Sequence, residues 1–289
     1  MELRVLRYFL TVVREENISR AADILHVTQP TLSRQLAQLE EELGVQLFIR
    51  GRHLSLTDAG VMLRRRAEEV VALMDKIENE FEEQDEVGGI ISIGSGGLIA
   101  SQILSGVMES FRKKYPKVQY QFYTNSADFV KERLEQGLLD FGLLLEPIDI
   151  TKFDYIRMKE KEKWGLLIRA DHPLASKECI TKDDLLTEPL ITTNRLSIQK
   201  ELESWLDGSI SDLDIFATYN IITNVAMLVN SGAASALTIE GAVNLFEGSK
   251  LTFRPLFPEL SMTSVLAWKK FQPNFGAAGR FLEHFKSMQ

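Results

Sequence analysis

The stretch Thr28-Gln29-Pro30-Thr31-Leu32-Ser33-Arg34-Gln35-Leu36 decides the fold of the first part of this chain, because it describes the start of a two-faced helix. Thr28 is a favourable N-cap residue, and Pro30 is tolerated in the first helical turn, where backbone N–H groups lack intrahelical partners. Leucines then recur at helical spacing and predict a face directed at a core: Leu32, Leu36, Leu39 and Leu43.

A second face of this predicted helix carries only uncharged polar or basic side chains, namely Thr31, Arg34, Gln35 and Gln38. Gln29 and Ser33 add hydrogen-bonding groups at the helix start. Such side chains can bond base edges and phosphates when a helix enters the major groove with its N-terminus first. The alternative is an ordinary solvated helix face. We favour DNA because a helix-turn-helix pattern stands directly in front.

That pattern consists of two shorter helices. Apolar residues at helical spacing predict the first: Leu3, Leu6, Phe9, Leu10 and Val13. Asn17 offers an N-cap for the second, Arg20–Leu25, whose alanines permit close helix packing. After the third helix, alternating segments in 44–56 flank a glycine-containing turn and predict a hairpin wing. Arg50 and Arg52 lie at its tip, within reach of the DNA backbone or minor groove.

The motifs of this segment closely resemble the LysR-type transcriptional regulators. They are Ser19-Arg20-Ala21-Ala22, the quoted 28–36 run, Leu39-Glu40, Leu43-Gly44, Leu47-Phe48, Arg50 and Leu56-Thr57-Asp58-Ala59-Gly60. The resemblance implies a sequence-specific DNA-binding regulator that responds to a small-molecule effector. It also places Gln29, Pro30, Thr31, Ser33 and Arg34 at the DNA-contacting helix start, and Arg50 and Arg52 in the wing.

A long helix is predicted from Thr57 to about Glu83. Its apolar residues alternate by four and three positions, as in the seam of a coiled coil: Leu63, Ala67, Val70, Met74, Ile77 and Phe81. We interpret this seam as a dimerisation surface, because helix-turn-helix proteins usually read paired DNA half-sites as two-fold symmetric dimers. The alternative is a long helix that lies on its own domain. The acidic stretch 82–89 ends in Gly88-Gly89 and is interpreted as a hinge.

From Ile90 onward strand and helix patterns alternate, which predicts parallel α/β structure. The stretches 90–93, 118–123 and 141–145 are strand-like, and a similar alternation restarts at Trp164. By resemblance, this half is an effector domain of two subdomains with the type 2 periplasmic-binding-protein fold. We therefore expect a winged helix-turn-helix over 1–57, a linker helix and hinge over 58–89, and an effector domain over 90–289. Within the effector domain, subdomain I covers about 90–163 and 265–289, and subdomain II about 164–264.

Ligands of open α/β sheets bind beyond the carboxyl ends of the strands. Polar residues at those positions form the candidate effector site: Ser95, Thr124, Asn125, Ser126, Thr192, Thr193, Thr223 and Asn224. Hydroxyls together with helix N-terminal amides favour a small carboxylate or similar anion. The alternative is that several of these residues serve only as helix caps.

Composition limits the remaining function classes. The net charge of the 289 residues is −8, yet every basic residue before Lys76 is arginine, so a DNA-binding face has to be local. No apolar run approaches the roughly 20 residues of a membrane span, and the start does not resemble a signal peptide, so we expect a cytoplasmic protein. Cys179 stands alone, and the four histidines are scattered: His26, His53, His172 and His284.

We therefore expect no metal, no cofactor and no catalysis. An enzyme or transport-type binding protein on the same α/β fold is the alternative. The expected partners are double-stranded operator DNA, a small effector and a second copy of the chain, with dimers pairing further by resemblance. RNA polymerase is a further candidate partner.

Overall fold

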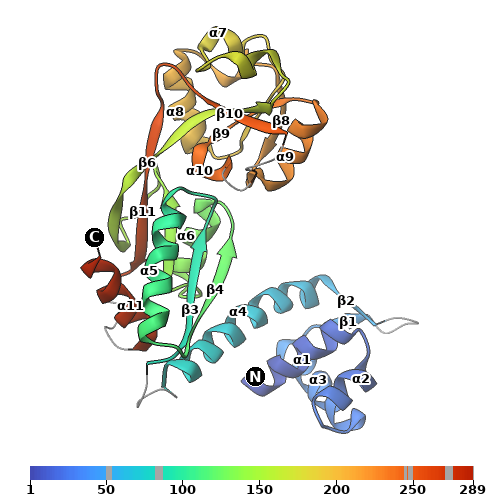
Figure 1. Ribbon diagram of the computed structural model, residues 1–289. Helices are drawn as coiled ribbons and strands as arrows, with labels where there is room; N and C mark the ends of the chain where they lie inside the picture. The colour runs from blue at the N-terminus through green and yellow to red at the C-terminus, as the bar shows by residue number, and fades with distance from the viewer. Residues whose placement is uncertain (50–53, 82–86, 244–245, 247–249, 271–275, 289) are drawn as a thin grey trace. The chain divides into compact units, whose positions relative to one another are not determined.

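The computed structural model describes residues 1–49, 54–81, 87–243, 246, 250–270 and 276–288 (Figure 1). The chain divides into two compact units, Met1–Glu82 and Glu83–Gln289. Among the described helices, none has the length and apolar character needed to cross a membrane.

The first unit is a three-helix core with a short hairpin and a long helix. Asn17 accepts a hydrogen bond from the Arg20 amide and begins the second helix, while Gly44 ends the third in a left-handed conformation (φ 67°) that favours glycine. Leu32, Leu36 and Leu39 of the third helix are buried in one core with Phe9 and Val12, as the spacing predicts. Leu43, which the spacing also assigned to the core, is 39% exposed because it lies in the last turn of the helix. The elements are α1 (Leu3–Glu15), α2 (Ile18–Ile24), α3 (Gln29–Leu43), β1 (Phe48–Ile49), β2 (Ser55–Leu56) and α4 (Asp58–Phe81).

Some apolar residues of helix α4 face the core of the first unit, and others face solvent. Thr57 caps it by accepting a hydrogen bond from the Gly60 amide (3.0 Å). Ala67 is buried in the core of the first unit, and Leu63 packs beside it. In contrast, other members of the predicted seam are exposed in the single chain: Val70, Met74 and Ile77. The side chain of Phe81 lies outside the described residues. The predicted seam is therefore divided between the chain's own core and an uncovered surface.

The second unit is built on a nine-stranded sheet with the order β4-β3-β5-β11-β6-β9-β7-β8, and β10 also pairs with β6. Strands β3, β4 and β5 pair in parallel, as do β7, β8 and β9. The strands are β3 (Gly89–Ser95), β4 (Val118–Thr124), β5 (Phe141–Leu145), β6 (Phe153–Arg169), β7 (Leu190–Thr193), β8 (Ile215–Tyr219), β9 (Ser235–Ile239), β10 (Leu251–Pro255) and β11 (Ser261–Lys269).

Helices cover both faces of the sheet. Alternate residues of β5 belong to different clusters: Phe141 and Leu143 pack with Phe111 and Phe281, whereas Leu144 packs with Val130. A strand buried on both faces appears as a continuous apolar run, which explains why 141–145 is recognisable in the sequence. The helices are α5 (Ala100–Lys114), α6 (Ala127–Glu135), α7 (Lys182–Leu185), α8 (Leu196–Leu206), α9 (Ile222–Ser231), α10 (Glu240–Val243) and α11 (Gly276–Ser287), with 3-10 turns at Pro173–Ser176 and Ile210–Asp212.

One long strand joins the two halves of this unit. The partner of β6 changes from β11 at Lys163 to β9 at Trp164, and the strand continues without a break (Figure 1). We name the half with β3, β4, β5, β11 and the first part of β6 lobe I, and the half with β7–β10 and the remainder of β6 lobe II. From the sequence, only the apolar stretch that begins at Trp164 was recognised as part of this strand. Residues 159–163, which precede it, alternate between lysine and glutamate and show no apolar pattern.

Glu162 lies in β6 at the boundary of the two lobes and is fully buried. Its Oε1 accepts a hydrogen bond from the Ile99 amide before α5 (2.6 Å). A Cβ on Gly241 would stand 2.6 Å from Oε2, so the start of α10 approaches the same carboxyl group closely. Burial raises the pKa of Glu162 to about 7, although the N–H groups of Ile99, Ala100 and Gly241 act in the opposite direction.

This raised pKa makes the stability of the second unit depend on pH. The folded value of about 7 lies above the ordinary value of 4.5. The contribution of the protonated group is therefore fully present below pH 4.5 and is lost as pH rises through 7, by about 3 kcal/mol. Glu162→Gln keeps the acceptor for Ile99 and should reduce the fall in urea midpoint between pH 5 and pH 8. An equal fall in both proteins would show that Glu162 does not titrate in this range.

Candidate functional site

The outer face of α3 presents the side chains that the sequence predicted for DNA. Gln29, Pro30, Arg34 and Gln38 are exposed, whereas Thr31, Ser33 and Gln35 are half-buried. The first turn is ordered by local contacts, because Gln29 donates to the Ser33 hydroxyl (3.0 Å) and Thr31 shares a hydrogen bond with Thr28 (2.8 Å). The helix start is thus ordered before any partner binds.

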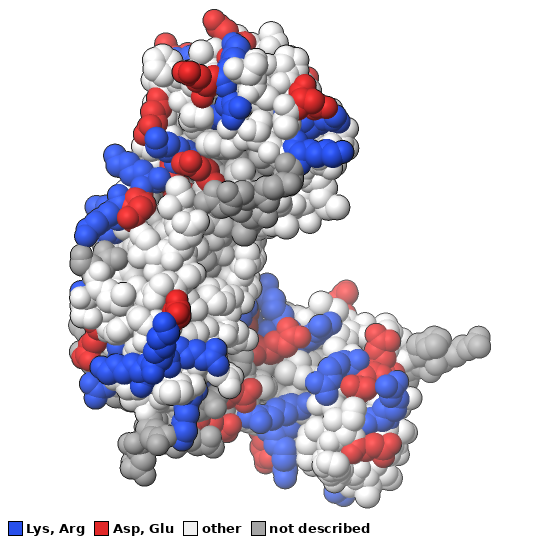
Figure 2. All heavy atoms as spheres, viewed as in Figure 1, with Lys and Arg blue, Asp and Glu red and all other residues white. Residues whose placement is uncertain are grey.

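Arg34 is the cation of this surface. In the described part of the chain, no carboxylate forms an ion pair with it, while arginines elsewhere in the unit do pair, such as Arg7 with Asp75 (2.6 Å). Figure 2 shows basic and acidic side chains interspersed on the visible face of this unit. An unpaired guanidinium on a helix face is suited to bidentate contact with guanine or with phosphate.

The hairpin is fixed to α3 by one carboxylate. Glu40 Oε1 accepts hydrogen bonds from the amides of Leu47 (2.7 Å) and Phe48 (3.2 Å), and β1 pairs with β2. This attachment positions the wing relative to α3. The wing-tip arginines, Arg50 and Arg52, lie outside the described residues, so their predicted contact stays a prediction.

The second unit contains a cleft of about 110 Å³ between its lobes. One ordered water needs roughly 10–15 Å³ on the same scale, so the cleft has room for a small organic molecule. Lobe I contributes Gly96, Gly97, Leu98, Thr124, Asn125, Ser126, Ala127, Leu143 and Leu145. Lobe II contributes Trp164, Thr193, Arg195, Ile198, Tyr219, Asn220, Ile221, Ile222, Thr223, Thr238, Ile239 and Ala242.

Three helices begin at this cleft without a capping side chain. The N-cap residues of α6, α8 and α9 are Ser126, Arg195 and Ile221, and no side-chain cap hydrogen bond is found at any of them. The first-turn amides of a helix need acceptors and carry partial positive charge. The described lining residues contain no aspartate or glutamate, and the one guanidinium among them, Arg195, is paired with Asp128 (3.0 Å). The electrostatics of the cleft therefore favour an anion.

The structure brings together five of the eight residues predicted for the effector: Thr124, Asn125, Ser126, Thr193 and Thr223 line the cleft. The other three lie outside the lining. Ser95 donates to the Gly96 carbonyl (2.7 Å), Thr192 is buried within β7, and Asn224 is exposed on α9. Thr192 and Thr193 differ because adjacent residues of a strand point to opposite faces.

Sequence reasoning missed four polar residues of the cleft, namely Arg195, Tyr219, Asn220 and Thr238. Arg195 directly precedes α8, and its buried side chain lines the cleft. The hydrogen-bond partners of this side chain are distant in sequence. Tyr219 ends β8 and donates its hydroxyl to the Leu237 carbonyl (2.8 Å). Burial raises the pKa of Tyr219 to about 12, so the phenol remains a neutral donor. The position of Tyr219 at a strand end was an available signal, whereas Arg195 had none.

No group of three or more His, Cys, Asp or Glu side chains in the described part of the chain is arranged to hold a metal ion. Cys179 is a free thiol of intermediate exposure. The polar groups of the cleft are hydroxyls, amides and one guanidinium, which are groups that bind and orient a ligand.

Comparisons with known proteins cover both units. Residues 3–61 match the family described as "Bacterial regulatory helix-turn-helix protein, lysR family", and residues 84–289 match "LysR substrate binding domain". The chain is 30% identical to the uncharacterized HTH-type transcriptional regulator YybE of Bacillus subtilis (strain 168), over 98% of this chain and 94% of that protein. It is also 30% identical to the Hca operon transcriptional activator HcaR of Escherichia coli (strain K12), over 93% and 92% of the two chains.

Solved structures support the fold. The LysR family regulator CbnR superposes with a TM-score of 0.78 at 22% identity, covering 99% of both chains. CbnR in complex with its target DNA gives a TM-score of 0.77 at 22% identity, covering 100% of both chains. The predicted fold class, a winged helix-turn-helix followed by a linker helix and an α/β effector domain, is confirmed. With both family matches and both units accounted for, this chain belongs to the LysR family of bacterial helix-turn-helix transcriptional regulators.

Proposed function

We propose that this LysR-type regulator is controlled by a small organic anion bound in the cleft between lobes I and II. The observation that carries the proposal is the convergence of three uncapped helix N-termini on a cleft whose described lining contains no carboxylate. Helix N-termini bind anions through oriented N–H groups and the helix dipole. Arg195 belongs to the same lining, but Asp128 balances the charge of its guanidinium (3.0 Å), so the helix amides carry the argument.

The remaining walls indicate the body of the ligand. Apolar side chains of both lobes face the cleft, among them Leu98, Leu143, Trp164, Ile198 and Ile222. Burying an apolar body against such walls contributes roughly 25 cal/mol per Å². A small carboxylate with an apolar body fits this combination better than a polar sugar or a peptide. The hydroxyls of Thr124 and Ser126 are suited to orient it.

For DNA, we propose that the outer face of α3 reads the major groove. The order of the first helical turn and the unpaired charge of Arg34 support this role. CbnR, which shares the fold, has been solved with its target DNA. By the same proposal Arg50 and Arg52 contact DNA from the wing, and the protein acts in the cytoplasm, where bacterial operator DNA is found.

The dimer is proposed to form through the uncovered side of α4. Val70, Met74 and Ile77 are 49%, 36% and 40% exposed, and they follow one another at the spacing of a coiled-coil seam. Leu63 and Ala67, which the same spacing included, pack within the chain instead. Pairing of dimers and contact with RNA polymerase are further proposals. Because the family consists of regulators, we propose that the cleft senses its ligand without transforming it.

Arg34→Ala tests the reading helix. A duplex selected from a random library by the wild-type protein should bind the variant more weakly, by about 1–3 kcal/mol, which is roughly 5- to 150-fold in Kd. Arg280→Ala is the matched control, because it removes the same charge from α11 of the second unit. Fluorescence anisotropy measures both. Equal affinity of Arg34→Ala and the wild type, or an equal loss in the control, would exclude α3 as the reader.

Thr124→Trp tests the cleft. We would screen the full chain by thermal shift against small carboxylates, each paired with its neutral amide. A carboxylate present at 100 times its Kd should stabilise the wild type by about 2.7 kcal/mol. The tryptophan should occupy the cleft and abolish this shift while leaving DNA affinity unchanged. Thr187→Trp, at an exposed threonine outside the lining, serves as the control. Amides that stabilise as well as carboxylates would contradict an anion site.

A further inference from the structure

The guanidinium of Arg195 crosses from lobe II to lobe I. Its Nε donates to Asp128 Oδ2 on α6 (3.0 Å), Nη1 to the Leu145 carbonyl (3.3 Å) and Nη2 to the Pro147 carbonyl (3.1 Å). All three acceptors belong to lobe I. Within the described part of lobe II, the backbone of Arg195 is held, because its amide donates to Thr193 Oγ1 (3.3 Å).

Because the Arg195 guanidinium is buried, it depends on these three acceptors in place of water. The Arg195 side chain is only 7% exposed, whereas that of Asp128 is 59% exposed. A buried guanidinium that loses its acceptors carries a desolvation penalty, and it regains water only if the lobes separate. The three hydrogen bonds form only when the lobes are close together, so they favour the closed arrangement.

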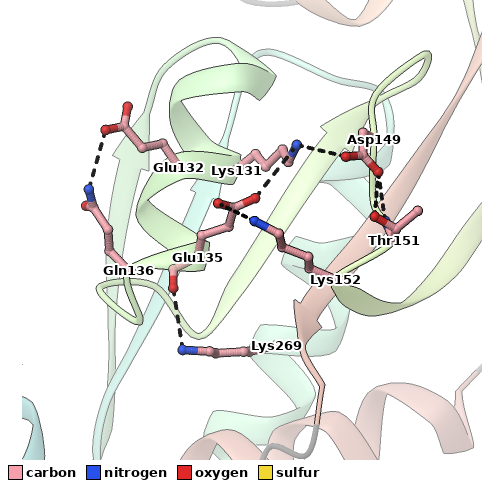
Figure 3. Close-up of polar contacts among 8 residues, drawn as sticks. All are labelled: Lys131, Glu132, Glu135, Gln136, Asp149, Thr151, Lys152 and Lys269. Atoms are coloured by element: carbon pink, nitrogen blue, oxygen red, sulfur yellow. Dashed lines mark hydrogen bonds and ion pairs between the residues drawn. The ribbon is translucent and has the colours of Figure 1, made fainter.

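The acceptors in lobe I are themselves held in place. Asp128 is on α6, and Pro147 is in the segment that follows β5. Figure 3 shows that ion pairs join these two parts: Lys131 of α6 lies 3.6 Å from Asp149, and Lys152 lies 3.4 Å from Glu135 of α6. The acceptors of Arg195 therefore move as one body with lobe I.

On the other side, Arg195 is fixed to the start of α8. Its carbonyl accepts hydrogen bonds from the amides of Ile198 (3.1 Å) and Gln199 (3.0 Å). Gln199 in turn donates from its side chain to the Thr193 carbonyl (2.8 Å), which links α8 to the end of β7. A force on the guanidinium is thus transmitted to the sheet of lobe II.

We propose that Arg195 is an interlobe clasp, a positioning residue that holds lobes I and II closed through Asp128 and two lobe I carbonyls. The clasp acts with or without a ligand in the cleft, so it goes beyond the proposed effector site. It also gives the regulator a defined resting arrangement from which a ligand shifts the equilibrium between closed and open lobes.

The test measures the distance between the lobes in the full-length protein. Spin labels are attached to the native Cys179 of lobe II and to Lys113→Cys on the exposed end of α5. An excess of unlabelled Cys179→Ser protein suppresses distances between the chains of an oligomer. Pulsed electron spin resonance should show that Arg195→Ala adds a population at longer distance that the wild type lacks.

Arg157→Ala is the matched control. Arg157 forms a bidentate ion pair with Glu146 (2.8 and 3.0 Å), and both of these residues belong to lobe I. This variant should keep the wild-type distance distribution. An unchanged distribution in Arg195→Ala, or an equal broadening in both variants, would overturn the clasp.

A second variant decides the question if Arg195→Ala fails to fold. Asp128→Lys changes a mostly exposed side chain and places a positive charge beside the guanidinium. Repulsion should also populate the longer distance, and a folded Asp128→Lys protein with the wild-type distribution would overturn the clasp. These experiments contain no effector. Failure of the carboxylate screen would therefore leave this result standing, and a failed clasp would leave carboxylate binding by the wild type intact.

Discussion

The antiparallel pairing of β6 with β11, and then of β6 with β9, is the interaction on which the second unit depends. Because one continuous strand serves both lobes, the lobes share a hinge and their strand ends face a common cleft. The buried carboxyl group of Glu162 sits in that strand, against the start of α5 and close to Gly241. The same constraint brings the starts of α6, α8 and α9 to the cleft.

The distribution of charge explains how an acidic protein presents two surfaces suited to anions. The chain carries a net charge of −8, yet the described cleft lining contains no carboxylate, and Arg34 on α3 has no ion-pair partner in the described part of the chain. Neutral hydroxyls and uncapped helix amides provide the favourable potential in the cleft, and Arg34 provides it on α3. Local geometry, and not the overall charge, therefore determines the partner of each surface.

Local patterns predicted the parts of the fold that depend on local chemistry. Thr28 and Pro30 mark the start of α3, and the apolar run at 141–145 identifies β5. The full length of β6 was not predicted, because the first part of this strand is mostly exposed and rich in charged residues. The seam of α4 was predicted from spacing alone, and spacing cannot show that Ala67 is already covered by the chain's own core.

The residues of the candidate site also divide into those that local sequence patterns predicted and those that only the fold brings together. Strand ends with hydroxyls predicted Thr124, Ser126 and Thr193, since parallel strands bring such positions to one edge. Arg195 was missed because its partners are 48 to 67 residues away in sequence. An isolated arginine after a strand has no local signature, and only the folded arrangement of two lobes gives it a role.

We propose that ligand binding in the cleft is energetically linked to DNA binding by α3. The most direct measurement compares two ratios for a carboxylate found to bind: the change in DNA Kd caused by the saturating ligand, and the change in ligand Kd caused by saturating DNA. Thermodynamic linkage requires the ratios to be equal, and we expect a common value of about 5 to 150. A carboxylate that fills the cleft and leaves the DNA Kd unchanged would show that the two sites are not coupled.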